Sequence, residues 1–357
     1  MQPLRKDLSA PFDPVVIPTS AQEEWKYTNL QSMVMKLGLT RTEMHIPDIS
    51  DMTFFTHDLT PSQTEAPKTV LAKTVTSRPK SLYGFTVPQG ERIITPLIIR
   101  HTAEEQTYLP DWQVLTLEPN SAFFLIEYFE EGAGSWHNAF AQIKLARDSK
   151  LTHIRFFEGK ADTIHTVTTH ALLAENANYK QISLTTSAGL LRQENHIELQ
   201  GEHAEVTIGG IIALHGKDHV DNTILIEHKA ENCRSNQHFK YLLNDESKGV
   251  FQGKVHVHKQ AQKTDGFQRC NTILLSPDAV MNTKPELEIY ADDVKCSHGT
   301  TTGELDETPL FYLRSRGLPE KDARRLLLQA FIGEVLELVD DENTRTEMEA
   351  KVTDALL

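Results

Sequence analysis

The chain has 357 residues, of which 39% are hydrophobic and 24% are charged. This balance is typical of a globular protein with one large core or two to three modules, and it excludes intrinsic disorder and collagen-like order. Fifty acidic side chains against 36 basic ones leave a formal net charge of −14 without any basic run, which argues against a nucleic-acid partner. The three cysteines, Cys233, Cys270 and Cys296, form no CxxC pair, so neither a disulfide framework nor a four-cysteine metal site is expected.

Cysteine usage and the N-terminal sequence indicate a cytoplasmic protein. The opening residues, MQPLRKDLSAPFDPV, contain no apolar signal-peptide core. No apolar run reaches the roughly 18 residues that span a bilayer, so we expect a soluble protein without membrane contact.

Residues 1–82 are expected to form a small helical region. Ser20 followed by Glu23 has the pattern of a capping box. Apolar residues then recur at roughly helical spacing, at Trp25, Leu30, Met33 and Leu37.

Residues 83–303 change to short β-branched and aromatic runs, such as RIITPLIIR and FFLIEYF, separated by polar clusters. A small residue in a polar corner recurs within them at intervals of 28, 28, 27, 29 and 28 residues, at Ser121, Ser149, Ala177, Ala204, Cys233 and Ala261. Regular spacing in this range is typical of a solenoid, and 28 residues suit one coil with two strands of a β-helix. The leucine-rich repeat consensus is absent, but the spacing can also arise because Ser and Ala are common residues.

Residues 304–357 turn helical again. Pro309 lies early in a first helix that Gly317 ends, and Pro319 then opens a second. The second helix carries an apolar stripe, at Ala323, Leu327, Ala330, Phe331, Val335 and Leu338. Such a stripe usually packs on its own protein, and partner binding is the alternative.

Cys296 and His298 are the pair with the clearest chemical potential. On a strand, positions two apart share a face, so a thiolate and an imidazole would project together about 6.5 Å apart at their α-carbons. Two ligands do not complete a tetrahedral site. The pair is therefore either an incidental core cysteine beside a surface histidine, or a half-site that another chain or an inorganic cluster completes.

Other candidate motifs are weaker. His256 and His258 share one strand face opposite Val255 and Val257, which favours a solvated face, although alternating histidines can bind metal weakly. The run GVFQGKV lacks the spacing of a phosphate loop, so the chain is expected to have no nucleotide site of its own. Carboxylates are abundant at 286–293, but acid/base pairing needs distances that sequence does not give.

Four longer strings together resemble the SufB/SufD family of iron–sulfur cluster assembly proteins. They are EEWKYTNL (23–30), FQGKVHVHKQAQKTDGFQ (251–268), MNTKPELEIYADDVKCSHGTTTGELDE (281–307) and LFYLRSRGL (310–318). Residues 296–300 read Cys-Ser-His-Gly-Thr where the SufB branch has Glu-His-Glu-Ala-Thr, and Leu313 replaces a SufB cysteine after the Phe-Tyr pair, so the SufD branch is the better match. Thr300 departs from the usual SufD alanine.

The resemblance implies a mainly β fold, with a right-handed parallel β-helix flanked by N- and C-terminal helical regions. It also implies a complex with SufB and the ABC-type ATPase SufC, and SufC is expected to dock on the C-terminal region. The partner-binding residues expected there are Phe311, Tyr312, Arg314 and Arg316. Cys296 and His298 become candidate ligands for iron or a transient iron–sulfur cluster shared with SufB.

The function expected from the sequence is that of a non-enzymatic scaffold subunit. Cys233 is assigned to packing of a solenoid corner, and Cys270 has no assigned role. A carbohydrate-active β-helix enzyme and a homodimeric β-helix binding module remain as alternatives, and the isolated chain is a possible homodimer.

Overall fold

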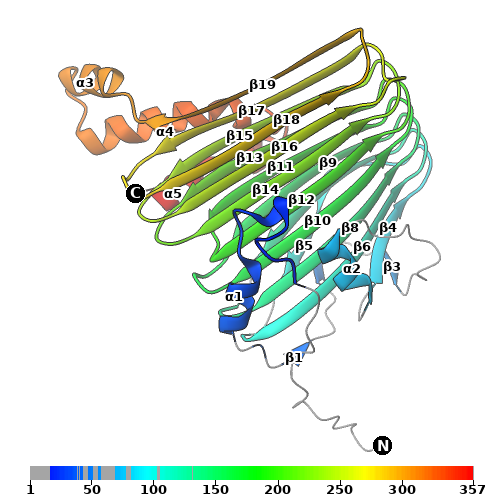
Figure 1. The fold of residues 1–357 in the computed structure, drawn as a ribbon, viewed down its shortest axis with the longest axis horizontal. Helices are drawn as coiled ribbons and strands as arrows, with labels where there is room; N and C mark the ends of the chain where they lie inside the picture. The colour runs from blue at the N-terminus through cyan, green and yellow to red at the C-terminus, as the bar shows by residue number, and fades with distance from the viewer. Residues whose placement is uncertain are drawn as a thin grey trace, which may run out of the picture.

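A computed structural model describes residues 17–37, 39, 41–42, 47–50, 55–57, 69–77, 82–102, 105–130 and 132–356. Its centre is a parallel β-helix of about eight turns with two strands per turn (Figure 1). From β4 onward, each strand pairs with the strand two further along the chain, so the even- and odd-numbered strands of the coil form two separate sheets. The solenoid predicted from the corner spacing is confirmed.

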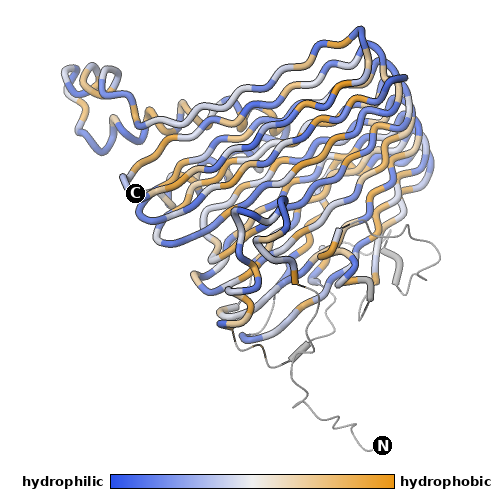
Figure 2. The backbone as a smooth tube through the Cα atoms, viewed as in Figure 1, coloured by the Kyte–Doolittle hydropathy of each residue, from blue (hydrophilic) through white to orange (hydrophobic). Residues whose placement is uncertain are grey.

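The long strands carry most of the chain. The even-numbered sheet contains β4 (Leu82–Val87), β6 (Thr107–Leu117), β8 (Trp136–Leu145), β10 (Ile164–Leu173), β12 (Leu190–Leu199), β14 (His219–His228), β16 (Lys248–Val257) and β18 (Val280–Ile289). The odd-numbered sheet contains β5 (Arg92–His101), β7 (Ala122–Phe129), β9 (Lys150–Glu158), β11 (Asn178–Ser187), β13 (Glu205–Leu214), β15 (Arg234–Leu243), β17 (Thr264–Leu274) and β19 (Val294–Glu304). Apolar and polar positions alternate along much of the coil (Figure 2), because successive side chains point into and out of the solenoid.

The corners of the coil explain the regular spacing of the small residues. Each of the first five predicted small residues is buried and follows a residue with a φ between 55° and 60°, namely Asn120, Asp148, Asn176, His203 and Asn232. Asn and Asp tolerate this left-handed conformation better than most residues. The polar residue before each small one therefore adopts the left-handed conformation that forms the turn.

The sixth corner differs from the prediction. Ala261 is buried, but the register pairs Arg234 with Asp265, so Thr264 occupies the position equivalent to Cys233. Lys263 supplies the positive φ there, at 57°. A longer connection between β16 and β17 moves the corner by three residues, which a search at fixed spacing does not detect.

The C-terminal helices are α3 (Glu307–Ser315), α4 (Glu320–Leu336) and α5 (Glu342–Leu356). The predicted pair is followed by a third helix, and Gly317, with a φ of 94°, ends the first as expected. Helices α4 and α5 pack on the outer face of the odd-numbered sheet through a shared apolar cluster. The buried positions of α4 correct the predicted stripe, because Ala330 is exposed whereas Leu328, Ile332 and Leu336 are buried with Ala323 and Val335.

The N-terminal segment is broken where one helix was predicted. A 3-10 turn, η1 (Glu23–Trp25), precedes α1 (Leu30–Leu37), and Asn29 caps α1 by accepting from the Ser32 amide at 3.1 Å. The predicted capping box is not formed, because Gln22 occupies the N-cap of η1 without a side-chain hydrogen bond. A further helix, α2 (Val70–Ser77), contacts β6, β8 and β10. Within the described ranges, no helix is long and apolar enough to cross a membrane.

The two ends of the solenoid are built differently. Short strands β2 (Asp48–Ile49) and β3 (Phe55–His57) pair antiparallel with β5 and β4, while β1 (Arg41–Thr42) pairs with β6. At the other end, β18 and β19 are the last strands of their sheets, and no other described strand pairs beyond them. The solenoid therefore has one covered end and one open end.

Candidate functional site

Cys296 and His298 lie on β19, at the open end. Their register partners on β17 are Gly266 and Gln268, and the Gln268 side chain is buried inside the solenoid. Both residues therefore lie on the inward face of β19, in the last coil. Because no described coil covers them, inward-facing positions are accessible here.

The two side chains differ in their surroundings. Cys296 is half-buried and packs against an apolar cluster that includes Val255 and Ala291, whereas His298 is exposed. A methyl group on Gly266 would lie 3.3 Å from the Cys296 sulfur, so glycine leaves room for the thiol. Burial raises the pKa of the Cys296 thiol. The thiolate form that binds metal therefore needs a positive partner or a metal to stabilise it.

A polar floor lies beneath His298. Gln237 and Gln268 stack in register under it, and both are buried. The Gln268 amide donates to the Glu286 carbonyl at 3.3 Å, while Gln268 Oε1 and both polar atoms of Gln237 have no hydrogen-bond partner among the described residues. A side chain at Gly253 would approach both glutamine oxygens at 2.9 Å. Polar groups, rather than apolar packing, thus line the interior next to the exposed imidazole.

Cys296 and His298 do not make a complete metal site with the other described residues. Three groups of potential metal ligands occur in the described part of the chain, and neither residue belongs to any of them. A thiolate and an imidazole suit zinc, iron or a cluster, but a tetrahedral centre takes four ligands. No third ligand from the described residues lies beside this pair.

The predicted partner-binding residues lie on α3, or at its C-cap in the case of Arg316, and α3 extends away from the β-helix (Figure 1). Phe311 and Tyr312 are 70% and 57% exposed, although Leu310 beside them is buried. Arg316 places its guanidinium 5.2 Å from the centre of the Tyr312 ring, and Arg314 pairs with Glu320 at 3.5 Å. The helix presents adjacent aromatic and basic groups to solvent.

The other two cysteines are enclosed. Cys233 is buried in its solenoid corner, where its thiol donates to the Gly201 carbonyl at 3.2 Å, and burial raises its pKa to about 11. Cys270 is buried inside the coil, and burial raises its pKa further. Of the three thiols, only that of Cys296 is partly accessible.

A buried ionic network inside the first coils was missed by the sequence analysis. Glu127 accepts from His101 at 3.0 Å, from His153 at 2.5 Å and from Arg155 at 3.1 Å. Burial alone would raise the pKa of the Glu127 carboxyl, but these three neighbours hold it well below its usual range. The four residues come from three successive odd-numbered strands, β5, β7 and β9. The only sequence signal for this network is that all four occupy inward-facing positions of their strands.

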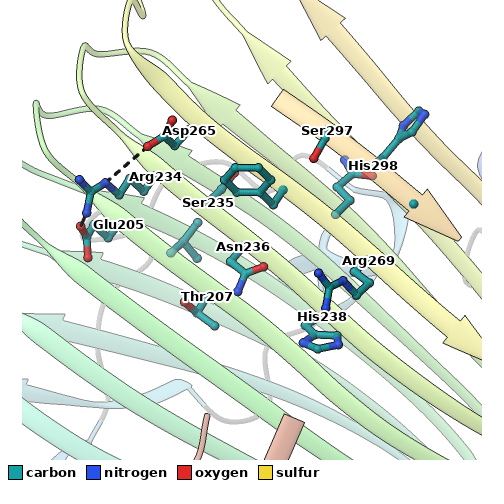
Figure 3. A pocket seen from close by; sticks show the side chains of 14 residues that line it. Glu205, Thr207, Arg234, Ser235, Asn236, His238, Asp265, Arg269, Ser297 and His298 are labelled. Atoms are coloured by element: carbon teal, nitrogen blue, oxygen red, sulfur yellow. Dashed lines mark hydrogen bonds and ion pairs between the residues drawn. The ribbon is translucent and has the colours of Figure 1, made fainter. Parts of the chain in front are cut away.

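A shallow groove of about 760 Å³ lies on the outer face of the odd-numbered sheet and reaches β19 (Figure 3). Its side chains come from β13, β15, β17 and β19. Arg234 is held there by Glu205 at 3.3 Å and by Asp265 at 3.9 Å. Ser297 and His298 border its end.

Comparison with known proteins assigns the family. The profile of the SUF system FeS cluster assembly SufBD core domain matches residues 99–331. The chain belongs to the SufBD family. The matched SufBD core covers nearly all of the β-helix and extends into α4, and it includes Cys296, His298 and the exposed face of α3.

Similarity to individual SufBD family proteins supports the same family assignment. The chain is 29% identical to the iron-sulfur cluster assembly protein SufD of Escherichia coli over 374 residues, which cover 94% of this chain and 88% of that protein. It is 36% identical to a SufBD family protein of Synechocystis, over 57% of this chain and 45% of that protein. It is 30% identical to SufD of Plasmodium berghei, over 61% of this chain and 16% of that protein. These matches support a role in iron–sulfur cluster assembly and confirm the predicted SufB/SufD resemblance.

Proposed function

We propose that this SufBD family member is a non-enzymatic scaffold subunit that pairs with a SufB-type paralogue through its open end and docks a SufC-type ABC ATPase on its C-terminal helices. The observation that carries this proposal is the placement of Cys296 and His298 at the uncovered end of the solenoid. A scaffold that supplies only two ligands must share its site.

The open end has the properties of a pairing surface. A terminal strand of a sheet presents unpaired backbone N–H and C=O groups, which are a template for another chain. Val280, Ile289 and Tyr290 are 41%, 38% and 58% exposed at this end. A second β-helix placed here would bury these apolar side chains, and without the paralogue the same edges would favour a homodimer.

Iron and sulfide are the cargo of the proposed site. The Cys296 thiolate supplies a soft ligand and the His298 imidazole a borderline one, and the paralogue supplies the rest. Because burial raises the pKa of Cys296, proton loss would accompany metal binding.

The C-terminal helices connect the proposed ATPase surface to the solenoid. Helix α3 carries the exposed Phe311 and Tyr312, and its main helix contact among the described elements is with α4. Helices α4 and α5 share an apolar cluster with the odd-numbered sheet that ends in β19. A displacement of α3 on ATP hydrolysis would thus be transmitted to the sheet that carries Cys296 and His298. The ATPase must be external, since no P-loop sequence occurs in this chain.

The ligand assignment is tested on the complex reconstituted with SufB- and SufC-type partners. We expect the double variant Cys296→Ala/His298→Ala to assemble normally and to form far less cluster, as followed by visible absorbance and acid-labile sulfide. The matched control is Cys270→Ala, which removes a buried thiol on the neighbouring strand. Full cluster formation in the double variant, with the complex intact, would refute the assignment.

The docking assignment is tested by retention of the ATPase on the immobilised full chain. The change Phe311→Asp/Tyr312→Asp should abolish retention, because it places charges on the exposed aromatic face of α3. Ile94→Asp, at a site that is 77% exposed on β5, is the control and should retain the ATPase. Retention by both variants would place the docking surface elsewhere.

A further inference from the structure

Histidines and glutamates gather on the outer face of the even-numbered sheet, whereas Cys296 and His298 lie on the inward face of the odd-numbered sheet. The members come from four neighbouring strands and the turn after β16, and they are His170, His196, Glu198, Glu227, His256 and His258. The proposed scaffold function uses none of them. Ligand atoms of Glu227, His256 and His258 all lie within 4.8 Å of one another.

The register of β14 and β16 fixes this trio in place. Val255 and Val257 are fully buried in the interior, so the alternate positions His256 and His258 must face outward. Glu227 is directly paired with His256 in the parallel ladder. Glu227 and His256 therefore sit on paired strands and His258 directly follows β16, and such rigid elements position ligands more precisely than loops do.

The side chains are already in mutual contact. His258 Nε2 lies 3.0 Å from Glu227 Oε2, and the rings of His256 and His258 stack with centroids 4.3 Å apart. The ring of His256 makes no hydrogen bond with any described residue, so its nitrogen lone pair is not used by the fold. His258 is 30% exposed and Glu227 is 14% exposed, which gives an ion access from solvent.

Two imidazoles and a carboxylate form a ligand set typical of zinc and of non-haem Fe(II), with remaining positions open to water. Tetrahedral ligands at about 2.0–2.1 Å from zinc lie roughly 3.4 Å apart, which side-chain rotation can reach from the present spacing. We propose that Glu227, His256 and His258 form a binding site for a divalent first-row transition metal. It is independent of the proposed cluster ligands, because Cys296 and His298 lie on the inward face of the other sheet.

Two neighbouring groups are expected to have opposite effects on metal affinity at the proposed site. His196 Nε2 lies 2.6 Å from the other oxygen of Glu227 and orients the carboxylate. Lys229 lies 3.4 Å from Glu227 and 2.7 Å from Glu198, and its charge opposes a bound cation. Removing the charge of Lys229 should therefore strengthen metal binding.

The test uses the full chain carrying Cys296→Ser/His298→Gln, so that the inward pair contributes no signal. Titration with Zn²⁺ alone by calorimetry, and with Co²⁺ alone by visible absorbance, should show one equivalent bound. Adding His256→Gln/His258→Gln should weaken binding by about tenfold or more. His215→Gln removes an exposed histidine outside the trio and should leave binding unchanged.

A variant that binds metal more tightly shows that losses of binding in the other variants are not caused by misfolding. Lys229→Gln should tighten Zn²⁺ binding several-fold, which an unfolded variant would not do. The proposal is overturned if the parent protein binds no stoichiometric metal, or if the His256/His258 double variant binds as well as the His215 control. Loss of binding in His170→Gln, with binding kept in the double variant, would place the ion at the adjacent trio of His170, His196 and Glu198 and would also overturn it.

Discussion

The two ends of the β-helix carry the same strand architecture but are finished in opposite ways. Strands β4 and β5 are each paired with a short antiparallel strand, whereas β18 and β19 are the last strands of their sheets in the part of the chain that the structure describes. Inward positions are buried in the middle coils, yet on β19 Cys296 is half-buried and His298 is exposed. The proposed cluster ligands therefore lie where the repeat stops.

The N-terminal segment covers part of the outer face of the even-numbered sheet. Trp25 stacks on the guanidinium of Arg192 at 3.8 Å, and Arg192 is also paired with Asp221. Arg192 is fully buried on the outer face of the even-numbered sheet, so the indole and the carboxylate together replace its hydration. The Arg192 guanidinium is therefore part of the packed structure, whereas the thiol of Cys296 is only half-buried and the imidazole of His298 is exposed.

Removing the N-terminal cover should have the largest effect on stability. Trp25→Ala is expected to reduce the free energy of unfolding by about 3–5 kcal/mol, because it exposes Arg192 and leaves a cavity. Tyr290→Ala, at a site that is 58% exposed at the open end, should change it by less than about 0.5 kcal/mol. Urea unfolding measures both, and equal losses would show that the Trp25 cover over β12 contributes no more to stability than the open end does.

Charging the open end should break pairing without unfolding the chain. Val280→Asp/Ile289→Asp is expected to weaken the complex with a SufB-type paralogue by about 100-fold, since both side chains would be buried there. Ile94→Asp is the control on β5. Unchanged affinity by calorimetry, with the fold intact by circular dichroism, would contradict pairing through this end.

Gly266 tests the fit of Cys296 at the open end. In Gly266→Ala the new methyl would crowd the sulfur at 3.3 Å and Val255 at 3.4 Å, at a cost of about 1 kcal/mol. The thiol should be displaced toward solvent and react faster with iodoacetamide. Gly299→Ala meets nothing within 4 Å and should change neither quantity. Identical thiol reactivity in both variants would show that Cys296 is not held by Gly266.

Alkylation of the native chain should distinguish the three thiols. Cys296 is expected to react first, and Cys233 and Cys270 only on unfolding, because both are buried. Since burial raises the pKa of the Cys296 thiol, its thiolate fraction at neutral pH is lower than that of a free thiol, and its rate should level off at a higher pH than that of glutathione. Mass spectrometry of both thiols across a pH series measures this. A plateau at the same pH as glutathione, or below it, would contradict the raised pKa.

Local rules explain which parts of the fold were predictable. The corner at Asn176 and Ala177 repeats because each turn needs a left-handed residue and then a small buried one, and both requirements are visible in the sequence. Thr264 was missed because one longer connection shifts the register. Leu328 was missed because the face of α4 that is buried depends on the sheet beneath it.

The site was predictable to a different extent. Two-residue periodicity correctly placed Cys296 and His298 on one strand face, and Val255 and Val257 on the inward face. Their position in the last coil depends on where the solenoid ends, which no local pattern encodes. The network around Glu127 was invisible for a related reason, since its members are about one coil apart in sequence and meet only through strand register.

Hydrogen exchange on the full chain, with and without a SufB-type paralogue, tests the central claim most directly. If the paralogue pairs through the open end, the amides of β18 and β19 should exchange readily in the free chain and become protected in the complex. The exchange of amides in β4 and β5 should not change. Protection confined to the β4 and β5 end, or unchanged exchange in β18 and β19 in a formed complex, would contradict the account.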